Sequence, residues 1–370
     1  MPYYRMGGIS QYTILLIQAL ADLDVGNEYT IFHNARDGRS YLPESAPNFH
    51  RWDVWTPCHH RWERWALSAE LVNYGWRRGG LDVLHSPDFI PPVRGARRRI
   101  VTIHDLNFLY FPELLTAESR RYYADQIRRA VREADHMIAD SEATRRDLVE
   151  ELGVPSERIT AIPLAANPQY AQPPSDAAVT QVCAQFNLPR GFILFVGTLE
   201  PRKNLPALIR AYHAMRHETG IDAPLVLVGS KGWMYEDVFA TAEALGLRGA
   251  VYHLDGINNE QLAALYSAAA VLVLPSFYEG FGLPVLEAMH CGCPVVASDR
   301  GSLPEVVGKA GVLLGPEDDV SAWASALARV INDGRFREDL VKRGFEQVKK
   351  FSWQKTAAAT LQVYLAPFGE

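Results

Sequence analysis

The feature that most constrains the fold of this chain is an alternation of short apolar runs with longer segments of helical periodicity. Runs that are apolar throughout are typical of parallel strands buried on both faces. Their alternation with helices predicts right-handed βαβ crossovers, and therefore an α/β protein with doubly wound parallel sheets. The expected strands are residues 29–33, 81–86, 99–105, 136–141, 158–164, 191–197, 224–230, 251–256, 270–276, 294–299 and 311–315.

Length and one irregular segment divide the chain into domains. A chain of 370 residues exceeds one ordinary core. Residues 165–188 are rich in Pro, Gln, Ala and Ser and are typical of a domain connection. We expect a Rossmann-like domain at 1–168, a second at 169–350, and a final helical segment at 351–370. Ligands bind such sheets at the carboxyl ends of their strands, so a cleft faced by both domains is the expected active site.

The beginning of the chain departs from the pattern. A glycine turn at residues 6–10 runs into a helical segment at about 9–23, and no strand precedes it. A doubly wound sheet normally begins with that strand, because its neighbours otherwise lose a central hydrogen-bonding partner. We therefore expect that the first strand of the N-terminal domain is missing and that the chain starts about 10 residues late.

Composition excludes several classes of function. With 37 basic and 43 acidic residues the net charge is −6, which offers no global positive field for a nucleic acid. The four cysteines are too few for a disulfide framework and lack the spacing of structural zinc. No apolar run is long enough to span a membrane, and no basic region followed by an apolar stretch opens the chain. These features predict a cytoplasmic protein.

The most informative segment is residues 275–289, which leaves an apolar strand, passes Gly280 and Gly282, and enters a helix at Pro284. Free amides and the positive end of the helix dipole make such a loop an anion site, suited to phosphate. Glu279 and Glu287 flank it but are too far apart in sequence to form a close carboxylate pair by helical spacing. Each is expected to accept hydrogen bonds from hydroxyls of a phosphate-bearing ligand.

Cations and a histidine occupy similar places after other strands. Arg202 and Lys203 follow the first strand of the second domain, where two adjacent cations suit a diphosphate, although such pairs also occur on ordinary surfaces. His104 ends a strand of the first domain and is expected to face the cleft. The Cys58-His59-His60 run lacks the spacing of a metal site, and no metal ligands are predicted.

Together, Gly7-Gly8, His104-Asp105, Arg202-Lys203 and the Glu279–Glu287 stretch resemble the retaining, metal-independent glycosyltransferases of family 4, also called glycosyl transferases group 1. The resemblance covers nearly the whole chain apart from the missing first strand. It implies the GT-B fold, in which two Rossmann-like domains face a cleft. It also implies that the final helical segment crosses back onto the first domain.

The resemblance also implies the residues that bind a nucleotide sugar. Arg202 and Lys203 would bind the diphosphate and Glu287 the ribose hydroxyls, while Glu279 and the loop amides after it would hold the donor sugar and phosphate. The implied catalytic residues are His104, which would touch the sugar near its 6-position, Arg202, Lys203 and Glu279. The implied nucleotide-sugar-binding residues are Gly8, Gly197, Arg202, Lys203, Ile257, Phe281, Gly282, Leu283 and Glu287.

The expected reaction needs no metal or other cofactor, because cations and helix-start amides can neutralise a departing diphosphate. The expected donor is GDP-mannose or a UDP-hexose, and the acceptor is a saccharide or a lipid-linked molecule of polysaccharide, lipopolysaccharide or glycolipid synthesis. Transfer would proceed by front-face displacement with anomeric retention. A nucleotide-sugar epimerase of the same architecture and a catalytically silent binding protein are the rival functions, and incubation with donor alone distinguishes the epimerase.

An aromatic stripe in the first domain has two interpretations. One face of a helical segment carries Trp62, Trp65, Ala69, Val72 and Trp76. A helix packed onto the first sheet accounts for the stripe. A surface for a membrane edge or a sugar acceptor is the alternative, and it would place the protein peripherally at the inner face of a membrane. Residues 42–56 are expected to form a variable loop that reads the acceptor.

Overall fold

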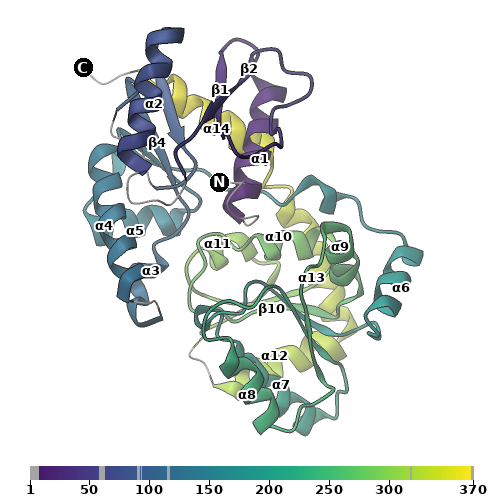
Figure 1. The fold of residues 1–370 in the computed structure, drawn as a ribbon. Helices are drawn as coiled ribbons and strands as arrows, with labels where there is room; N and C mark the ends of the chain where they lie inside the picture. Colours follow the sequence, from purple (N-terminus) through teal and green to yellow (C-terminus); the bar gives the residue numbers. More distant parts are fainter. Residues whose placement is uncertain are drawn as a thin grey trace. The chain divides into compact units, whose positions relative to one another are not determined.

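The computed structural model describes residues 8–57, 63–89, 92, 94–114, 117–316 and 319–367. The chain forms two compact units (Figure 1). The first unit comprises Met1–Leu164 together with Ser352–Glu370, and the second comprises Ala165–Phe351. Each unit is an α/β structure with only parallel strand pairing between its named strands.

The second unit is built on a six-stranded sheet in the order β12-β11-β10-β7-β8-β9. Four of its strands, β7, β8, β10 and β11, are buried at every residue, as expected for parallel strands covered on both faces. The strands are β7 (Ile193–Val196), β8 (Leu225–Val228), β9 (Val251–Leu254), β10 (Val271–Leu274), β11 (Val295–Ser298) and β12 (Gly311–Leu314).

Helices cover both faces of this sheet. Figure 1 shows α7, α8 and α12 on one side of β10 and α10 and α11 on the other. The helix after β7 and the helix after β10 thus lie on opposite faces, although β7 and β10 are neighbours. This is the topological switch point, where such sheets bind ligands. The helices are α6 (Asp176–Gln185), α7 (Leu205–Thr219), α8 (Glu236–Ala244), α9 (Asn259–Ala268), α10 (Leu283–His290), α11 (Leu303–Val307), α12 (Val320–Asn332) and α13 (Gly334–Val348).

The first unit contains two separate parallel sheets, one of order β1-β2 and one of order β3-β4-β5-β6. Its strands are β1 (Tyr29–Asn34), β2 (Phe49–Val54), β3 (Val83–Ser86), β4 (Arg98–Ile103), β5 (His136–Ala139) and β6 (Ile159–Ala161). Its helices are α1 (Gly8–Leu23), α2 (Glu63–Arg78), α3 (Asn107–Tyr110), α4 (Ala117–Glu133), α5 (Glu142–Leu152) and α14 (Trp353–Leu365).

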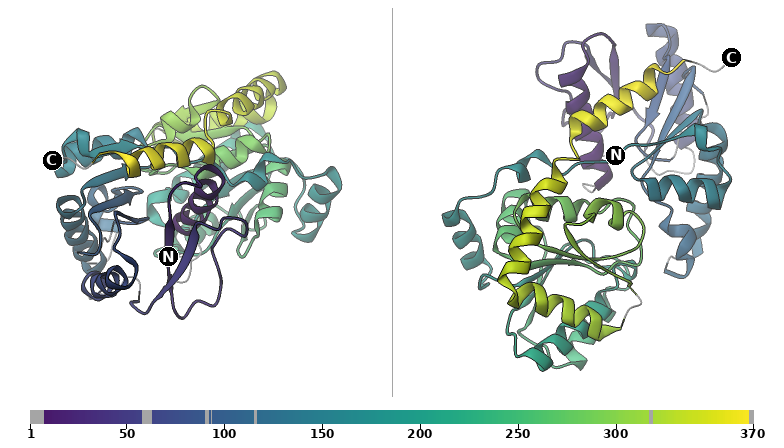
Figure 2. Two further views of the ribbon diagram at one scale, coloured as in Figure 1. Left: turned by 90° about the horizontal axis from the view of Figure 1, so that it is seen from above. Right: turned by 180° about the vertical axis from the view of Figure 1, so that it is seen from behind.

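Alternate residues of the four-stranded sheet point to two different helix layers. Val101 and Ile103 of β4 pack in a core with Ile127 of α4 and Leu148 of α5. Ile100 of the same strand packs on the opposite face with α14. There α1 and α14 lie side by side (Figure 2). The period of two along a strand explains why neighbouring residues serve different cores.

Two expectations about the first unit were wrong. Residues 42–56 were expected to be a loop, but they include β2, in which the buried Phe49 and Val54 stand at the two ends and His50 and Asp53 are exposed. Of the two interpretations of the aromatic stripe, packing on the sheet is wrong, because Trp65 and Trp76 are 61% and 89% exposed. Helix α2 instead buries the face that carries Leu71 and Tyr74. Trp62 lies outside the described residues.

Candidate active site

The predicted cations and carboxylate of the second unit meet at the switch point. Arg202 and Lys203 lie in the short helix η4 (Pro201–Lys203) after β7, and Glu279 lies in the loop after β10. Lys203 Nζ is 2.6 Å from Glu279 Oε1, and Arg202 Nη1 is 3.0 Å from Glu279 Oε2. Since β7 and β10 are adjacent and parallel, their carboxyl ends place residues distant in sequence at one edge.

Further contacts make this a closed network of charges. Arg202 Nε is 2.7 Å from Glu200, and Arg202 Nη1 donates to the carbonyl of Tyr278 at 3.0 Å. The Ser276 hydroxyl donates to Glu279 Oε1 at 2.6 Å. Glu200, Lys203 and Glu279 are all buried. The positive charges of two cations are therefore matched by the negative charges of two carboxylates within the network. These contacts hold the four side chains in place before any ligand binds.

Burial and pairing set the protonation of this network. Burial alone would raise the pKa of Glu279, but the charges of Lys203 and Arg202 and hydrogen bonds from Lys203 and Ser276 together lower it to about 2. Burial and the neighbouring Arg202 charge lower the pKa of Lys203, against the opposing effect of Glu279. We assign the ionised form to Glu279, because two cations surround its carboxylate.

This geometry changes one expectation from the sequence. Arg202 and Lys203 were expected to serve a diphosphate, and Glu279 a sugar, as separate groups. The structure places all three in direct contact. The carboxylate is thus also the group that orients the two cations, because it accepts a hydrogen bond from each.

The loop that leads into α10 is shaped by two glycines. Gly282, the N-cap of α10, has a φ of 89°, and a Cβ added there would lie 2.7 Å from the Leu303 side chain. A Cβ added to Gly301 would lie 2.4 Å from the carbonyl oxygen of Glu279. Ser302 donates to that same oxygen through its amide and its hydroxyl. The backbone that carries Glu279 is therefore fixed by close contact with residues 301–302.

The same loop offers backbone donors to an anion. Within the described ranges, the amides of Phe281, Gly282 and Leu283 have no hydrogen-bond acceptor. Pro284, in the first turn, has no amide hydrogen to contribute. Donors at the positive end of a helix suit phosphate or another anion.

Glu287 lies one turn into α10 and is buried. Its Oε2 accepts a hydrogen bond of 2.8 Å from the hydroxyl of Tyr266 on α9. Burial raises the pKa of Glu287 to about 7, although the Tyr266 hydrogen bond acts in the opposite direction. This carboxyl group therefore changes charge near neutral pH.

Glu287→Gln is expected to remove part of the pH dependence of stability. The raised pKa of Glu287 contributes stability that is complete below pH 4.5 and is lost as the pH rises through about 7. That loss amounts to as much as about 3 kcal/mol in the free energy of unfolding. Urea denaturation at pH 4.5 and pH 8 measures it. An unchanged pH dependence in the variant would contradict the assignment.

The remaining predicted residues of the second unit lie at strand ends. Gly197 follows β7, and its amide donates to the carbonyl of Val228 at 2.9 Å. Ile257 follows β9 and is half-buried. Because β8 separates β9 from β7, Ile257 is set two strands away from the ion network.

His104 and Gly8 belong to the first unit. Gly8 is the exposed first residue of α1. His104 follows β4, its Nδ1 is 2.6 Å from Asp140 Oδ2, and its Nε2 is 3.0 Å from the carbonyl of Pro87. Both ring nitrogens thus face acceptors, as in an imidazolium. Burial opposes this charge, but Asp140 dominates and raises the pKa of His104 to about 9.

Asp140→Asn is expected to lower the pKa of His104 from about 9 toward or below its ordinary value of 6.5, because burial then acts without the opposing carboxylate. Histidine ring resonances followed by NMR against pH measure the change. Asp82→Asn, at an exposed carboxylate of the same unit, is the matched control. A pKa that stays near 9 in the Asp140 variant would show that another group holds the proton.

Four residues of these sites were not predicted from the sequence. Glu200 and Ser276 lie within the segments already singled out, and Asp140 directly follows the strand β5, so a search of all strand ends would have found them. Tyr266 lies inside α9 and carries no such signal. Among the described residues, no group of three His, Cys, Asp or Glu side chains could hold a metal ion. Cys58, His59 and His60 lie outside those residues.

Comparison with known proteins decides the family. The model of Glycosyl transferases group 1 matches residues 184–347, and that of Glycosyltransferase Family 4 matches residues 6–170. O-antigen chain mannosyltransferase B of Escherichia coli is 32% identical over 98% of this chain and 96% of its own length. The chain belongs to glycosyltransferase family 4. This glycosyltransferase is also 32% identical to the MMP alpha-(1->4)-mannosyltransferase of Mycolicibacterium hassiacum over 84% of this chain and 76% of that protein.

Solved structures show the same GT-B architecture. Sucrose-phosphate synthase from Thermosynechococcus elongatus aligns with a TM-score of 0.76 at 25% identity, over 97% of this glycosyltransferase and 93% of that chain. Anabaena Alr3699/HepE in complex with UDP and glucose aligns with a TM-score of 0.76 at 20% identity, over 98% and 97%. Both matched family models and both mannosyltransferase relatives are named as transferases, and nothing in these comparisons supports the epimerase alternative. No helix within the described ranges has the length and apolar character of a membrane span.

Proposed function

We propose that this glycosyltransferase is a retaining, metal-independent mannosyltransferase that transfers mannose from GDP-mannose to a saccharide or lipid-linked acceptor. The observation that carries the proposal is the buried network of Arg202, Lys203 and Glu279 beside free amides at the switch point. The similarity to two mannosyltransferases supports the sugar. The name of the first of these supports a role in O-antigen or related polysaccharide synthesis.

The chemistry follows from where negative charge develops. Breaking the bond between the sugar and the diphosphate leaves charge on the departing diphosphate. Arg202 and Lys203 are cations fixed at the edge of the sheet, and the amides of Phe281, Gly282 and Leu283 add backbone donors. Together these groups offset that charge without a bound metal. The departing phosphate then takes the proton of the acceptor hydroxyl on the face it has left, which retains the anomeric configuration.

The carboxylates have separate roles in this proposal. Glu279 orients the cations and accepts a hydrogen bond from a hydroxyl of the donor sugar, because its carboxylate is ionised at all ordinary pH values. Glu287 accepts hydrogen bonds from the ribose hydroxyls, and its carboxylate is the better acceptor when it is ionised. Donor binding is therefore expected to strengthen as the pH rises through the pKa of Glu287, about 7. In the first unit, Asp140 holds His104 as an imidazolium.

Donor screening tests the proposal. Thermal unfolding is followed with GDP-mannose, UDP-glucose and ADP-glucose at one shared concentration, where a donor present at 100 times its Kd stabilises by about 2.7 kcal/mol and a weaker binder by less. GDP-mannose should stabilise most, and product formation should need an acceptor and persist in EDTA. The anomeric configuration of the product is read by NMR. Preference for a UDP sugar would reject GDP-mannose as the donor. Loss of turnover in EDTA would reject metal independence, and an inverted anomeric configuration in the product would reject the retaining mechanism.

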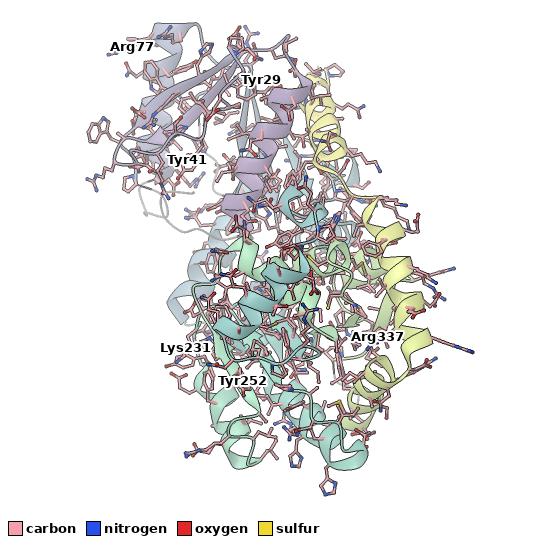
Figure 3. All side chains as sticks on the ribbon, turned by 90° about the vertical axis from the view of Figure 1, so that its right-hand side faces the viewer. Tyr29, Tyr41, Arg77, Lys231, Tyr252 and Arg337 are labelled. Atoms are coloured by element: carbon pink, nitrogen blue, oxygen red, sulfur yellow. The ribbon has the colours of Figure 1, made fainter. Side chains whose placement is uncertain are left out.

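We further propose cytoplasmic placement with peripheral contact at the inner membrane face. Trp65 and Trp76 are exposed on α2, and Arg77 in the last turn of the same helix is exposed and projects outward in Figure 3. Aromatic rings and basic side chains on one helix suit a bilayer interface with anionic lipids.

The double variant Trp65→Ala with Trp76→Ala is expected to lower sedimentation with anionic liposomes at low salt by at least about 10-fold, because it removes the exposed aromatic area. Trp233→Ala is the matched control, since this tryptophan is 41% exposed on the other unit. Full recovery of the unaltered protein in the supernatant would exclude this contact.

A further inference from the structure

The hydroxyl of Tyr266 holds one oxygen of the Glu287 carboxyl group. Tyr266 lies near the end of α9 and is completely buried, and its hydroxyl donates to Glu287 Oε2 at 2.8 Å. Within the described part of the chain, Glu287 Oε1 has no hydrogen-bond partner, and 8% of the residue is exposed. The protein therefore engages one carboxylate oxygen, and the other can accept from a ligand hydroxyl.

The ring of Tyr266 is itself held in place by Tyr170. Tyr170 lies in the short helix η3 (Pro168–Ala171) and is buried. The two rings meet edge to face, with their centroids 5.9 Å apart and their planes at 80°. A further contact ties η3 to α9, since Asn259 Nδ2 donates to Gln169 Oε1 at 3.1 Å. The packing of η3 on α9 therefore fixes the direction in which the Tyr266 hydroxyl points.

The Tyr266 hydroxyl is also what favours the ionised form of Glu287. Among the described residues Glu287 has no ion pair, whereas two cations surround Glu279. Burial raises the pKa of Glu287, and the hydrogen bond from Tyr266 opposes that rise. Burial also raises the pKa of Tyr266 well above its ordinary value, so its hydroxyl keeps its proton and remains a donor.

A carboxylate fixed in this way suits the adjacent 2′- and 3′-hydroxyls of a ribose. A mobile carboxylate would lose rotational freedom when it binds these hydroxyls, and that loss would weaken the complex. The contact from Tyr266 orders the Glu287 carboxylate before the nucleotide arrives. A sugar without these hydroxyls gains nothing from the ordered carboxylate, so the contact favours ribose over its deoxy forms.

We propose that Tyr266, held by Tyr170, is a positioning residue that fixes Glu287 so that the nucleotide site selects a ribonucleoside diphosphate by its 2′- and 3′-hydroxyls. This inference rests on the proposed role of Glu287 in binding ribose. Because Tyr266 is completely buried, its effect reaches the donor only through Glu287. The ribose is remote from the bond that breaks, so Tyr266 acts on donor binding rather than on the chemical step.

Binding of two nucleotides tests the proposal. The Kd values of GDP and 2′,3′-dideoxy-GDP are measured by calorimetry, and UDP and its dideoxy form replace them if the donor screen selects a UDP sugar. The unaltered protein should bind GDP at least about 10-fold more tightly than the dideoxy form. Tyr266→Phe should weaken GDP binding about 10-fold and dideoxy-GDP binding by less than about 2-fold. With the sugar donor, KM should rise about 10-fold while kcat changes by less than about 2-fold.

Two further variants complete the test. Tyr170→Leu removes the ring contact but leaves the Tyr266 hydroxyl in place, and it should lower the preference for GDP about 3-fold. Tyr212→Phe is the matched control, because Tyr212 is a completely buried tyrosine of the same unit whose hydroxyl donates to the carbonyl of Ala223 at 2.8 Å. This control should leave the preference for GDP unchanged.

The possible failures are distinguishable. An unchanged preference for GDP in the Tyr266 and Tyr170 variants, or equal weakening of both nucleotides, would overturn the positioning role and leave the proposed role of Glu287 standing. Equal binding of GDP and dideoxy-GDP to the unaltered protein would reject the role of Glu287 in binding ribose, and the positioning role of Tyr266 with it.

Discussion

Arg202→Ala is expected to lower kcat/KM for sugar transfer about 100-fold, which corresponds to roughly 3 kcal/mol of transition-state stabilisation. Arg202 is fixed by Glu200, Glu279 and the carbonyl of Tyr278, so its guanidinium is in place before the diphosphate departs. An alanine leaves only Lys203 and the loop amides to offset the developing charge. Initial rates with saturating and limiting donor measure the effect.

Two variants make this result specific. Arg202→Lys keeps the positive charge, but a lysine lacks the planar guanidinium that contacts Glu200 and Glu279 at the same time. Most of the loss in kcat/KM should therefore remain in this variant. Arg248→Ala removes an arginine that is 84% exposed in the same unit and should leave turnover unchanged. Retained turnover within a few-fold in the Arg202→Ala variant would reject its role in charge stabilisation.

Glu279→Gln is expected to lower the free energy of unfolding by about 3 to 5 kcal/mol at neutral pH, because the buried Lys203 loses its carboxylate partner and Arg202 keeps only Glu200. The low pKa of Glu279 has a pH signature as well. Its stabilising contribution is complete above pH 4.5 and is lost as the pH falls through about 2. The variant should therefore lose stability less steeply between these values.

Urea denaturation of both proteins measures the difference. Glu243→Gln is the matched control, since Glu243 is 65% exposed and pairs with Arg248 at the surface. It should change the free energy of unfolding by less than about 1 kcal/mol. A similarly small change for Glu279→Gln would mean that the buried cations find other partners.

The fold could be predicted largely from periodicity. The expected strands at residues 191–197 and 270–276 contain β7 and β10, and each is only a few residues longer than the observed strand. Such runs are predictable because burial on both faces requires apolar side chains at every position. Strand β2 was missed because its apolar and charged residues do not alternate with a period of two, which is the pattern that marks a half-buried strand.

The candidate site was predictable in its parts. Arg202, Lys203, Glu279 and Glu287 could be named because each follows a strand or opens a helix, and parallel strands present such positions at one edge. Their partners were not predictable. The pairing of Glu279 with both cations links residues more than 70 positions apart, and local patterns carry no information on that contact.

The amino-acid sequence by itself determined most of the strands and helices and the residue types at the strand ends, since these depend on local spacing and side-chain chemistry. Only the tertiary structure decided which charges pair, which face of α2 is buried and which hydroxyl holds Glu287. It also decided that Glu287 and His104 have raised pKa values, because desolvation and neighbouring charges exist only once distant segments have packed together.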